Sequence, residues 1–329
     1  MLSRDEISNS ANLNDLSNFG TDKSRVSPCE CVAYSGKRRA MEPDFILGGA
    51  PKCATTAIFD YLAQHPQIFA SDPKEPHFYA SAPLDRKVMQ GDYSKAKYLD
   101  LFAGKAADQV SGEASTHYLH RAQSVAPFLA QHNPDARLIF CLRDPADRAW
   151  SHFLYRYSTA GPYTLGGVGQ KKDFLKFMID PEMFSIGEYV RHLETFESHF
   201  DSEQILVIFF EELLGDTDGC LGRICRHIGA DPTFTFDLNE RSNETAYPRV
   251  SKIMPVADAL FTPLYRLAPV RRRKTLLERR LRLFFGSDGE KERIPSEERR
   301  LAIELYRPSI ERLAEKTGRD LTKWLCPRD

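Results

Sequence analysis

Two patterns of apolar residues alternate along the chain. Continuous apolar runs at 45–47, 138–142 and 205–210 are typical of strands that are buried on both faces, as in a parallel sheet. Between these runs, apolar residues recur at helical spacing. The remaining predicted elements are a short strand at 68–70, a helix that opens at Thr55, and helices at 92–103, 185–200, 217–228 and 296–316. We therefore expect an α/β fold in which helices flank a central parallel sheet, followed by a helical C-terminal region.

The pattern also suggests where the folded domain begins. Residues 1–42 are rich in Ser, Asn and Asp with little periodicity, and we expect a flexible N-terminal extension there. We expect residues 43–329 to form a single domain. Glycines, prolines and small polar residues at 158–170 predict a long loop, suited to a mobile lid. The basic residues at 271–282 predict either a solvated helix face or a surface for an anionic partner.

Composition excludes several classes of protein. A net charge of −1 over 329 residues predicts no bulk attraction to nucleic acid. No apolar run reaches the roughly 18 residues of a membrane span, and the N-terminus lacks the apolar core of a secretion signal. Seven scattered cysteines are typical of reduced thiols, so we expect a cytoplasmic protein. Cys29 and Cys31 lack partner ligands for zinc, and we expect no metal site.

The first predicted strand leads into a candidate phosphate-binding loop. A glycine pair after the strand allows a sharp turn, and Thr55 and Thr56 then open a helix. The unpaired amides and the dipole of that helix start, beside Lys52, suit an anion such as phosphate. A nucleotide triphosphatase would carry a hydroxyl for magnesium directly after the lysine, whereas Cys53 follows here. The loop therefore fits phosphate without that metal arrangement, and a purely structural turn is the alternative.

Three chemically active side chains follow this loop along the chain. Two prolines hold the segment 73–79 extended, and they present Lys74, Glu75 and His77 together. Beside a phosphate site, these groups could supply a general base and neutralise charge. A surface loop whose aromatic residues dock onto the core is the alternative.

A second ligand position is expected at the end of the 138–142 run. Arg143 lies at the carboxyl end of this central strand, where open α/β sheets bind their ligands. Asp144 can cap the next helix, and Ser151 lies on the face of that helix that can turn back to the strand end. A guanidinium and a hydroxyl together suit a phosphomonoester. A surface Arg–Asp pair with an exposed serine is the alternative.

Taken in order, these motifs resemble the sulfotransferases that use 3′-phosphoadenosine 5′-phosphosulfate (PAPS). The resemblance runs from residue 44 to about 326 and is strongest to the branch of heparan sulfate sulfotransferases and their bacterial relatives. The 51–56 loop is similar to the family's PKxGTT, and 74–79 is similar to its KE-x-HFF segment. Arg143 and Ser151 fall on the family's 3′-phosphate pair. Segments 187–193 and 205–213 also recur there in the same order.

This resemblance implies a P-loop-like three-layer fold and a reaction. The sulfuryl group would pass in line from PAPS to a hydroxyl or amine of a small-molecule, glycoside or lipid-linked sugar acceptor, without a metal. Glu75 would be the base, His77 would orient it or replace it, and Lys52 would stabilise the leaving phosphate. The cofactor-binding residues that the resemblance implies are Pro51, Lys52, Cys53, Ala54, Thr55, Thr56, Arg143 and Ser151.

The sequence departs from this family at three positions. Ala54 replaces the usual loop glycine, which a helix start tolerates if φ is negative. Ala80 and Ala114 stand where heparan sulfate enzymes often carry Asp and Lys, and these losses argue against a heparan-like acceptor. The alternatives to a sulfotransferase are a P-loop phosphotransferase that uses ATP and a non-catalytic nucleotide-binding protein of the same fold.

Overall fold

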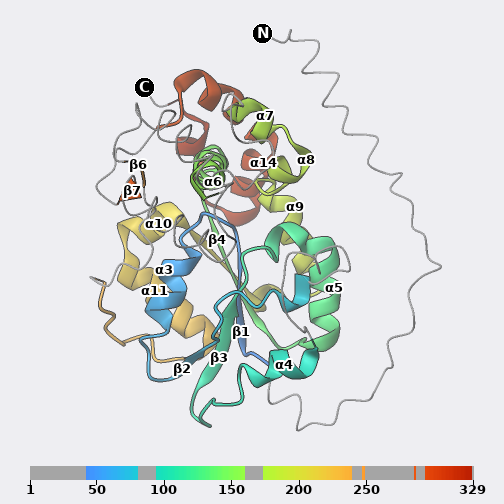
Figure 1. The fold of residues 1–329 in the computed structure, drawn as a ribbon, viewed down its shortest axis with the longest axis vertical. Helices are drawn as coiled ribbons and strands as arrows, with labels where there is room; N and C mark the ends of the chain where they lie inside the picture. Colours follow the sequence, from blue (N-terminus) through green and yellow to red (C-terminus); the bar gives the residue numbers. More distant parts are fainter. Residues whose placement is uncertain are drawn as a thin grey trace, which may run out of the picture. The chain divides into compact units, whose positions relative to one another are not determined.

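Five parallel strands form the central sheet of the computed structural model (Figure 1). The structure describes residues 42–80, 94–159, 173–238 and 293–327, with the short strands β6 (Tyr247–Pro248) and β7 (Phe285–Gly286). The order in the central sheet is β2–β3–β1–β4–β5. Its strands are β1 (Phe45–Gly49), β2 (Ile68–Ala70), β3 (Val110–Ala114), β4 (Arg137–Leu142) and β5 (Ile205–Phe209). The three apolar runs of the sequence and the short strand expected at 68–70 are thus confirmed as parallel strands.

The sheet is buried most deeply at its interior strands β3, β1 and β4. All of β1 is buried, and β4 is buried except for Arg137 at its start. Both strands are covered on two faces, which is why they appear in the sequence as continuous apolar runs rather than as an alternating pattern. The register of these two strands pairs Leu47 of β1 with Ile139 of β4. The carboxyl ends of β1 and β4 therefore lie next to each other.

Helices cover both faces of the sheet and make three layers. One face carries α3 (Thr55–Leu62) and α11 (Thr217–Ile228), and the other carries α5 (Ala122–His132) and α9 (Tyr189–Glu197). The longest described helix, α14 (Ser296–Thr317), packs on α9 and on α6 (Pro145–Thr159). The shorter helices are α4 (Lys95–Asp100), α7 (Phe174–Met178), α8 (Pro181–Ser185) and α10 (Phe210–Gly215). The predicted fold class is confirmed.

Several element boundaries differ from the sequence-based expectation. The helices α4 and α9 are shorter than predicted, whereas α3, α11 and α14 begin where their patterns begin. The sequence pattern did not predict α5, which contains Pro127 in its interior. Because proline lacks the amide that a helix interior uses, it obscured this helix. The predicted 158–170 loop overlaps the last residues of α6.

Some expectations fall outside the described residues. These are the N-terminal extension, the loop beyond residue 159 and the basic 271–282 segment. Cys29 and Cys31 lie outside them as well. Among the helices that the structure does describe, none is both long and apolar enough to cross a membrane.

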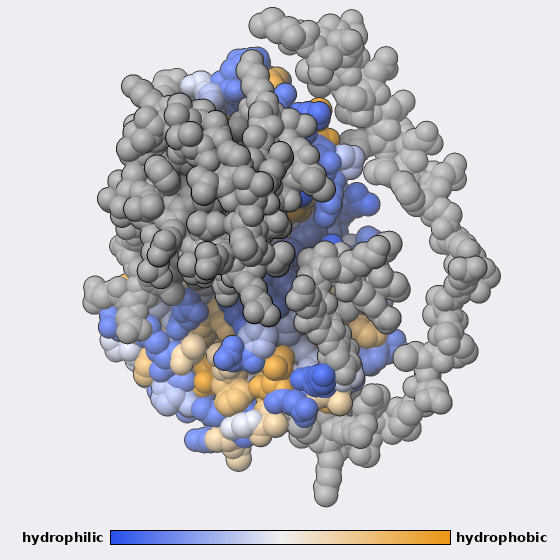
Figure 2. All heavy atoms as spheres, in the orientation of Figure 1, coloured by the Kyte–Doolittle hydropathy of each residue, from blue (hydrophilic) through white to orange (hydrophobic). Residues whose placement is uncertain are grey.

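The described surface is mixed in character on the face that Figure 2 shows. Hydrophobic residues gather toward the lower part of this view, where Figure 1 places β2 and β3, and hydrophilic residues border them. The strand β2 is an edge strand, and Phe69 and Ala70 in it are only half-buried. Partial exposure of an edge strand accounts for apolar side chains at this end of the sheet.

Candidate active site

The loop that follows β1 has an unusual backbone. Gly49 has a φ of +136°, and a Cβ atom there would lie 2.7 Å from the backbone oxygen of Thr116, so only glycine fits. Further along, Lys52 and Ala54 have φ values of 70° and 61°, in the left-handed region that L-residues rarely adopt. Two strained non-glycine residues therefore lie within one short loop, as is common where a loop binds a ligand.

Ala54 does not meet the condition, a negative φ, under which a helix start tolerates alanine in place of the family's glycine. As the residue before α3, it has φ 61° and ψ 19°, and it has no polar side chain to accept hydrogen bonds from the first helical amides. The family's usual glycine would adopt this conformation without strain. The first-turn amides of α3, together with the positive end of the helix dipole, are thus available to an anion.

Two cations of the candidate site lie side by side at neighbouring strand ends. Arg143, directly after β4, donates a hydrogen bond from Nη1 to the carbonyl oxygen of Lys52 at 3.3 Å. Burial, together with the charge of Arg143, lowers the pKa of the Lys52 ammonium. Within the described residues, the buried Nε of Arg143 has no hydrogen-bond partner. Anionic groups bound here would relieve the repulsion and satisfy that donor.

Aromatic rings hold both cations in position. The Nζ atom of Lys52 lies 4.2 Å from the ring centroid of Tyr155 on α6, and the guanidinium of Arg143 lies 4.6 Å from that of Phe210 on α10. Cation–π contacts of this kind fix a charged group without neutralising it. The charges therefore remain available to a ligand.

The predicted cap of α6 is confirmed. Asp144 Oδ1 accepts hydrogen bonds from the amides of Ala146 and Asp147, at 2.9 and 3.3 Å, and Pro145 is the first residue of the helix. Ser151 lies two turns further along α6 and is half-buried. In the described part of the chain, no hydrogen bond joins its hydroxyl to Arg143, so their joint role as a phosphate pair stays a prediction.

The remaining loop residues have different surroundings. Pro51 and Cys53 are buried, and the Cys53 thiol donates to the carbonyl of Pro51 at 3.7 Å. Burial raises the pKa of this thiol to about 12, so the thiolate is not formed at neutral pH. Thr55 is buried as the first residue of α3, whereas Thr56 is half-buried and joins the polar cluster described next.

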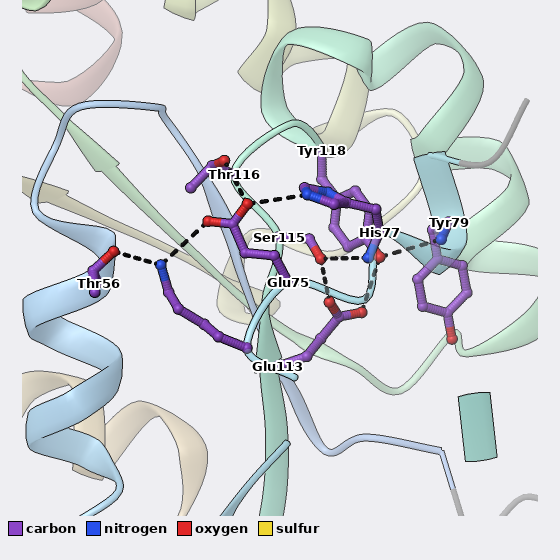
Figure 3. Close-up of polar contacts among 9 residues, drawn as sticks. Thr56, Glu75, His77, Tyr79, Glu113, Ser115, Thr116 and Tyr118 are labelled. Carbon is purple, nitrogen blue, oxygen red and sulfur yellow. Dashed lines mark hydrogen bonds and ion pairs between the residues drawn. The ribbon is translucent and has the colours of Figure 1, made fainter. Parts of the chain in front are cut away.

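A chain of polar contacts connects the phosphate loop to the candidate base (Figure 3). The ammonium of Lys74 donates to Thr56 Oγ1 at 2.7 Å and to Glu75 Oε1 at 3.2 Å. The other carboxylate oxygen of Glu75 lies 3.0 Å from His77 Nε2 and accepts a longer bond from Thr116 Oγ1 at 3.4 Å. The structure thus brings Thr56, the candidate base and its histidine into one cluster.

The charge state of Glu75 follows from these contacts. Burial alone would raise its pKa, but the hydrogen bond from His77 and the charge of Lys74 outweigh burial and lower the pKa to about 2. Glu75 is therefore a carboxylate at neutral pH and can accept a proton. A third of its side chain is exposed, at 34%, so a substrate can reach it.

A buried carboxylate below the cluster has a role that the sequence pattern did not predict. Glu113 at the end of β3 is fully buried and accepts hydrogen bonds from the hydroxyls of Tyr98, Tyr118 and Ser115, at 2.7, 2.9 and 2.5 Å. Burial raises its pKa. Ser115 in turn accepts the backbone amide of His77 at 3.0 Å. Glu113 therefore supports the strained His77 backbone, with φ 52°, from inside the core.

Only the short polar segment at the end of β3 and directly after it hinted at this support. Residues 112–118 carry a Glu, a Ser, a Thr and a Tyr in close succession, but their pattern predicts no more than a strand end that enters a loop. Tyr98 belongs to α4, whereas Ser115 and Tyr118 lie in the loop between β3 and η3 (Leu119–Arg121). Only the fold brings the three hydroxyls together around Glu113.

Further histidines surround the cluster. The ring of His117 stacks on that of His77, with centroids 4.7 Å apart, and His120 meets His117 edge-on at 5.3 Å. Burial is the first cause that lowers the pKa of His117, His120 and His152, the last to about 3. These imidazoles are therefore neutral at pH 7.

The comparisons with known proteins agree with this geometry. A family model described as a sulfotransferase domain matches residues 42–248, more than half of the chain. The chain is 30% identical over 198 residues to human heparan sulfate glucosamine 3-O-sulfotransferase 3B1, a match that covers 60% of this chain and 48% of that protein. The chain is also 26% identical over 247 residues to human carbohydrate sulfotransferase 15, a match that covers 58% of this chain and 44% of that protein. It therefore spans about half the length of these curated relatives.

A solved structure supports the same assignment at the level of the fold. The crystal structure of a sulfotransferase from Alicyclobacillus acidocaldarius superimposes with a TM-score of 0.59 at 22% identity, covering 86% of this chain and 98% of the other. The chain belongs to the sulfotransferase-domain family, which confirms the resemblance that its motifs indicate. This membership argues against an ATP-dependent phosphotransferase. Among the described residues, no group of three or more His, Cys, Asp or Glu could hold a metal ion.

The left-handed backbone at Ala54 generates the first prediction. Replacing Ala54 by glycine removes strain, and we expect the free energy of unfolding to rise by about 0.5–1 kcal/mol in urea titrations. The control is Ala63→Gly at the other end of α3, where φ is −65° and glycine gives no relief. That variant is expected to lose stability. Equal losses in both variants would contradict strain at Ala54.

The neutral histidines predict a pH dependence of folding. Because the pKa of folded His152 is about 3, the unfolded chain binds this proton first as the pH falls below about 6.5, and stability falls with it. In His152→Gln, the slope of the unfolding free energy between pH 7 and 5 is expected to flatten by about 1 kcal/mol per pH unit. His199→Gln, at an exposed histidine, is the control. An unchanged slope in the His152 variant would contradict the assignment.

Proposed function

We propose that the chain is a PAPS-dependent sulfotransferase that uses Glu75 as its base. The observation that carries this proposal is the Thr56–Lys74–Glu75–His77 cluster, in which a side chain of the phosphate loop is two hydrogen bonds from an ionised carboxylate. A base beside a phosphate loop suits transfer from a nucleotide to an acceptor hydroxyl. A scaffold protein would have no use for such a carboxylate.

The residues present fit PAPS. The donor carries anionic groups at its 5′ and 3′ positions, and the site offers cations at two neighbouring strand ends, Lys52 and Arg143. The buried Nε of Arg143, which has no partner among the described residues, is a donor that a phosphate oxygen would satisfy. Lys52, Thr55, Thr56 and the first amides of α3 would hold the 5′-phosphosulfate. Arg143 and Ser151 would hold the 3′-phosphate.

The chemistry of the reaction sets the tasks of these side chains. When bound, PAPS supplies the sulfuryl group and 3′,5′-bisphosphoadenosine as the leaving group. Lys52 and the helix amides stabilise the negative charge that develops on the leaving 5′-phosphate oxygen. Glu75 accepts the proton of the acceptor hydroxyl while the acceptor oxygen forms the new bond to sulfur and the bond from sulfur to the 5′-phosphate oxygen breaks. His77 holds the reactive oxygen of Glu75 in place, and positioning supplies most of the remaining rate.

The pKa of Glu75 is low for a general base, and Lys74 explains how it can still work. The Lys74 ammonium stabilises the carboxylate in the free protein. A bound donor competes with Glu75 for the same ammonium. Its negative charge attracts Lys74 directly, and it also binds Thr56, to which Lys74 donates. The basicity of Glu75 then rises when the donor is present, which is when a proton must be taken up.

The acceptor is proposed from the chemistry around the base. Two of the relatives are named as acting on heparan sulfate glucosamine and on carbohydrate. Ala80 and Ala114, where such enzymes often carry charged side chains, are both buried here, and the neighbouring histidines are neutral. We therefore propose a hydroxyl of a small molecule or glycoside of low charge, rather than a heparan-like polyanion.

The direct test of the activity uses labelled donor. The chain is incubated with ³⁵S-labelled PAPS and a metabolite extract, and sulfated products are identified by mass spectrometry. Glu75→Gln removes the base at nearly constant shape, so we expect turnover to fall at least about 100-fold while the product nucleotide still binds. Lys52→Ala is expected to lose turnover to a similar extent.

Two results would contradict this proposal. Near-normal turnover of Glu75→Gln would exclude Glu75 as the base. Transfer of phosphate from labelled ATP with magnesium, and none from PAPS, would support the phosphotransferase alternative instead.

The second cation has a separable role in binding. Arg143→Ala is expected to weaken PAPS binding about 10- to 100-fold, because it removes a charge-assisted fork from one phosphate. Turnover at saturating PAPS should change much less. The KM for PAPS and kcat are measured separately, with Arg137→Ala on the exposed start of β4 as the control. A loss confined to kcat would contradict a binding role for Arg143.

A further inference from the structure

A buried ion pair connects the C-terminal helix to the end of β4. Arg299 of α14 is 1% exposed, and its two terminal nitrogens donate to Asp144 Oδ2 at 2.6 Å and to Asp147 Oδ1 at 2.7 Å. Asp144 is fully buried and immediately follows Arg143. The sequence separation exceeds 150 residues, so this contact exists only through the fold.

The same short stretch of backbone is held from three elements. Tyr189 of α9 donates its hydroxyl to the carbonyl oxygen of Arg143 at 2.9 Å, and Glu211 of α10 accepts the amide of Asp144 at 3.3 Å. Arg299 completes this arrangement through the Asp144 side chain. Side chains of α9, α10 and α14 therefore anchor the backbone from which the Arg143 side chain extends.

The carboxylate of Asp144 has two tasks that Arg299 connects. Its Oδ1 caps α6, the helix that carries Ser151, while its Oδ2 receives the guanidinium. Asp147 adds a second attachment in the first turn of α6. One side chain of α14 thereby orients both Arg143, through the neighbouring residue, and Ser151, through the direction of the helix.

We propose that Arg299 is a positioning residue for the site of the donor's 3′-phosphate. This inference rests on the proposed function and adds a residue that touches neither donor nor acceptor. Without the guanidinium, the Asp144 carboxylate would be a buried charge without its counter-ion, and the cap and the strand end would rearrange together. The 3′-phosphate contacts would suffer first, because both residues assigned to that phosphate depend on Asp144.

A role in general stability makes a different prediction, and two nucleotides separate the two readings. Adenosine 3′,5′-bisphosphate has both phosphates, whereas adenosine 5′-monophosphate lacks the one at the 3′ position. If Arg299 has a positioning role, its loss weakens the binding of adenosine 3′,5′-bisphosphate alone. A loss of overall folding would weaken the binding of both by the same factor.

The experiment measures the dissociation constants of both nucleotides by calorimetry on the full chain. The wild type is expected to prefer the bisphosphate strongly. In Arg299→Met, that preference should fall at least about tenfold, while the affinity for the monophosphate stays within about twofold. Arg299→Lys keeps the charge but loses the fork, so its preference for the bisphosphate should lie between those of the wild type and of Arg299→Met.

Controls make the outcome unambiguous. Arg300→Met removes the neighbouring arginine, which is half-exposed and pairs with Glu297 and Glu304 on its own helix, and it should leave both constants unchanged. If Arg299→Met does not fold, Arg299→Lys and Asp147→Asn replace it, with an expected loss of preference of about threefold each.

Two results overturn the inference in distinguishable ways. A preference for the bisphosphate that persists in the folded Arg299 variants, or an equal weakening of both nucleotides, overturns the positioning role alone. A wild type without any preference for the bisphosphate overturns the proposed donor, and the inference with it.

Discussion

The contact between Arg143 and the carbonyl of Lys52 is the constraint on which the site depends. It joins the carboxyl ends of β1 and β4 and places two cations together in a partly buried setting, where the charge of Arg143 already lowers the pKa of Lys52. Like charges in such a setting are unfavourable unless an anion joins them. The core buries β1 and β4 on both faces, and this rigidity keeps the two charges close before any ligand arrives.

Left-handed residues occur in two loops that meet at this site. Lys52, Ala54 and His77 each have a φ between 52° and 70°, and such conformations cost about 1–3 kcal/mol apiece in non-glycine residues. Each is fixed by a specific partner. Arg143 binds the carbonyl of Lys52, the amide of Ile58 binds that of Ala54, and Ser115 accepts the amide of His77. The strain lies where the donor and the base would have to be presented.

Local pattern was enough to predict most of the sheet and to single out candidate site residues, whose roles stay predictions. Buried strands and the helix start after the loop are encoded within a few residues, so the positions of Lys52, Glu75 and Arg143 followed from the sequence. Partners that are distant in the chain did not. Arg299 looks like one of several arginines in an amphipathic helix, and Glu113 looks like an ordinary strand-end acid, until the fold buries each of them. The positive φ of Ala54 could not be read from the sequence either, because a residue type does not fix its backbone angle.

Glu113 and Glu75 illustrate how the surroundings give two carboxyl groups different roles. Glu113 is fully buried among three hydroxyl donors and forms no ion pair within the described part of the chain, and burial raises its pKa. Glu75 is partly open, and the contacts with His77 and Lys74 lower its pKa to about 2. The first therefore suits a structural support for the His77 backbone, and the second suits exchange of a proton with an acceptor. Ser115 links Glu113 to the backbone of His77, and the His77 ring contacts Glu75. A change at the buried acid would therefore reach the exposed one through three polar contacts.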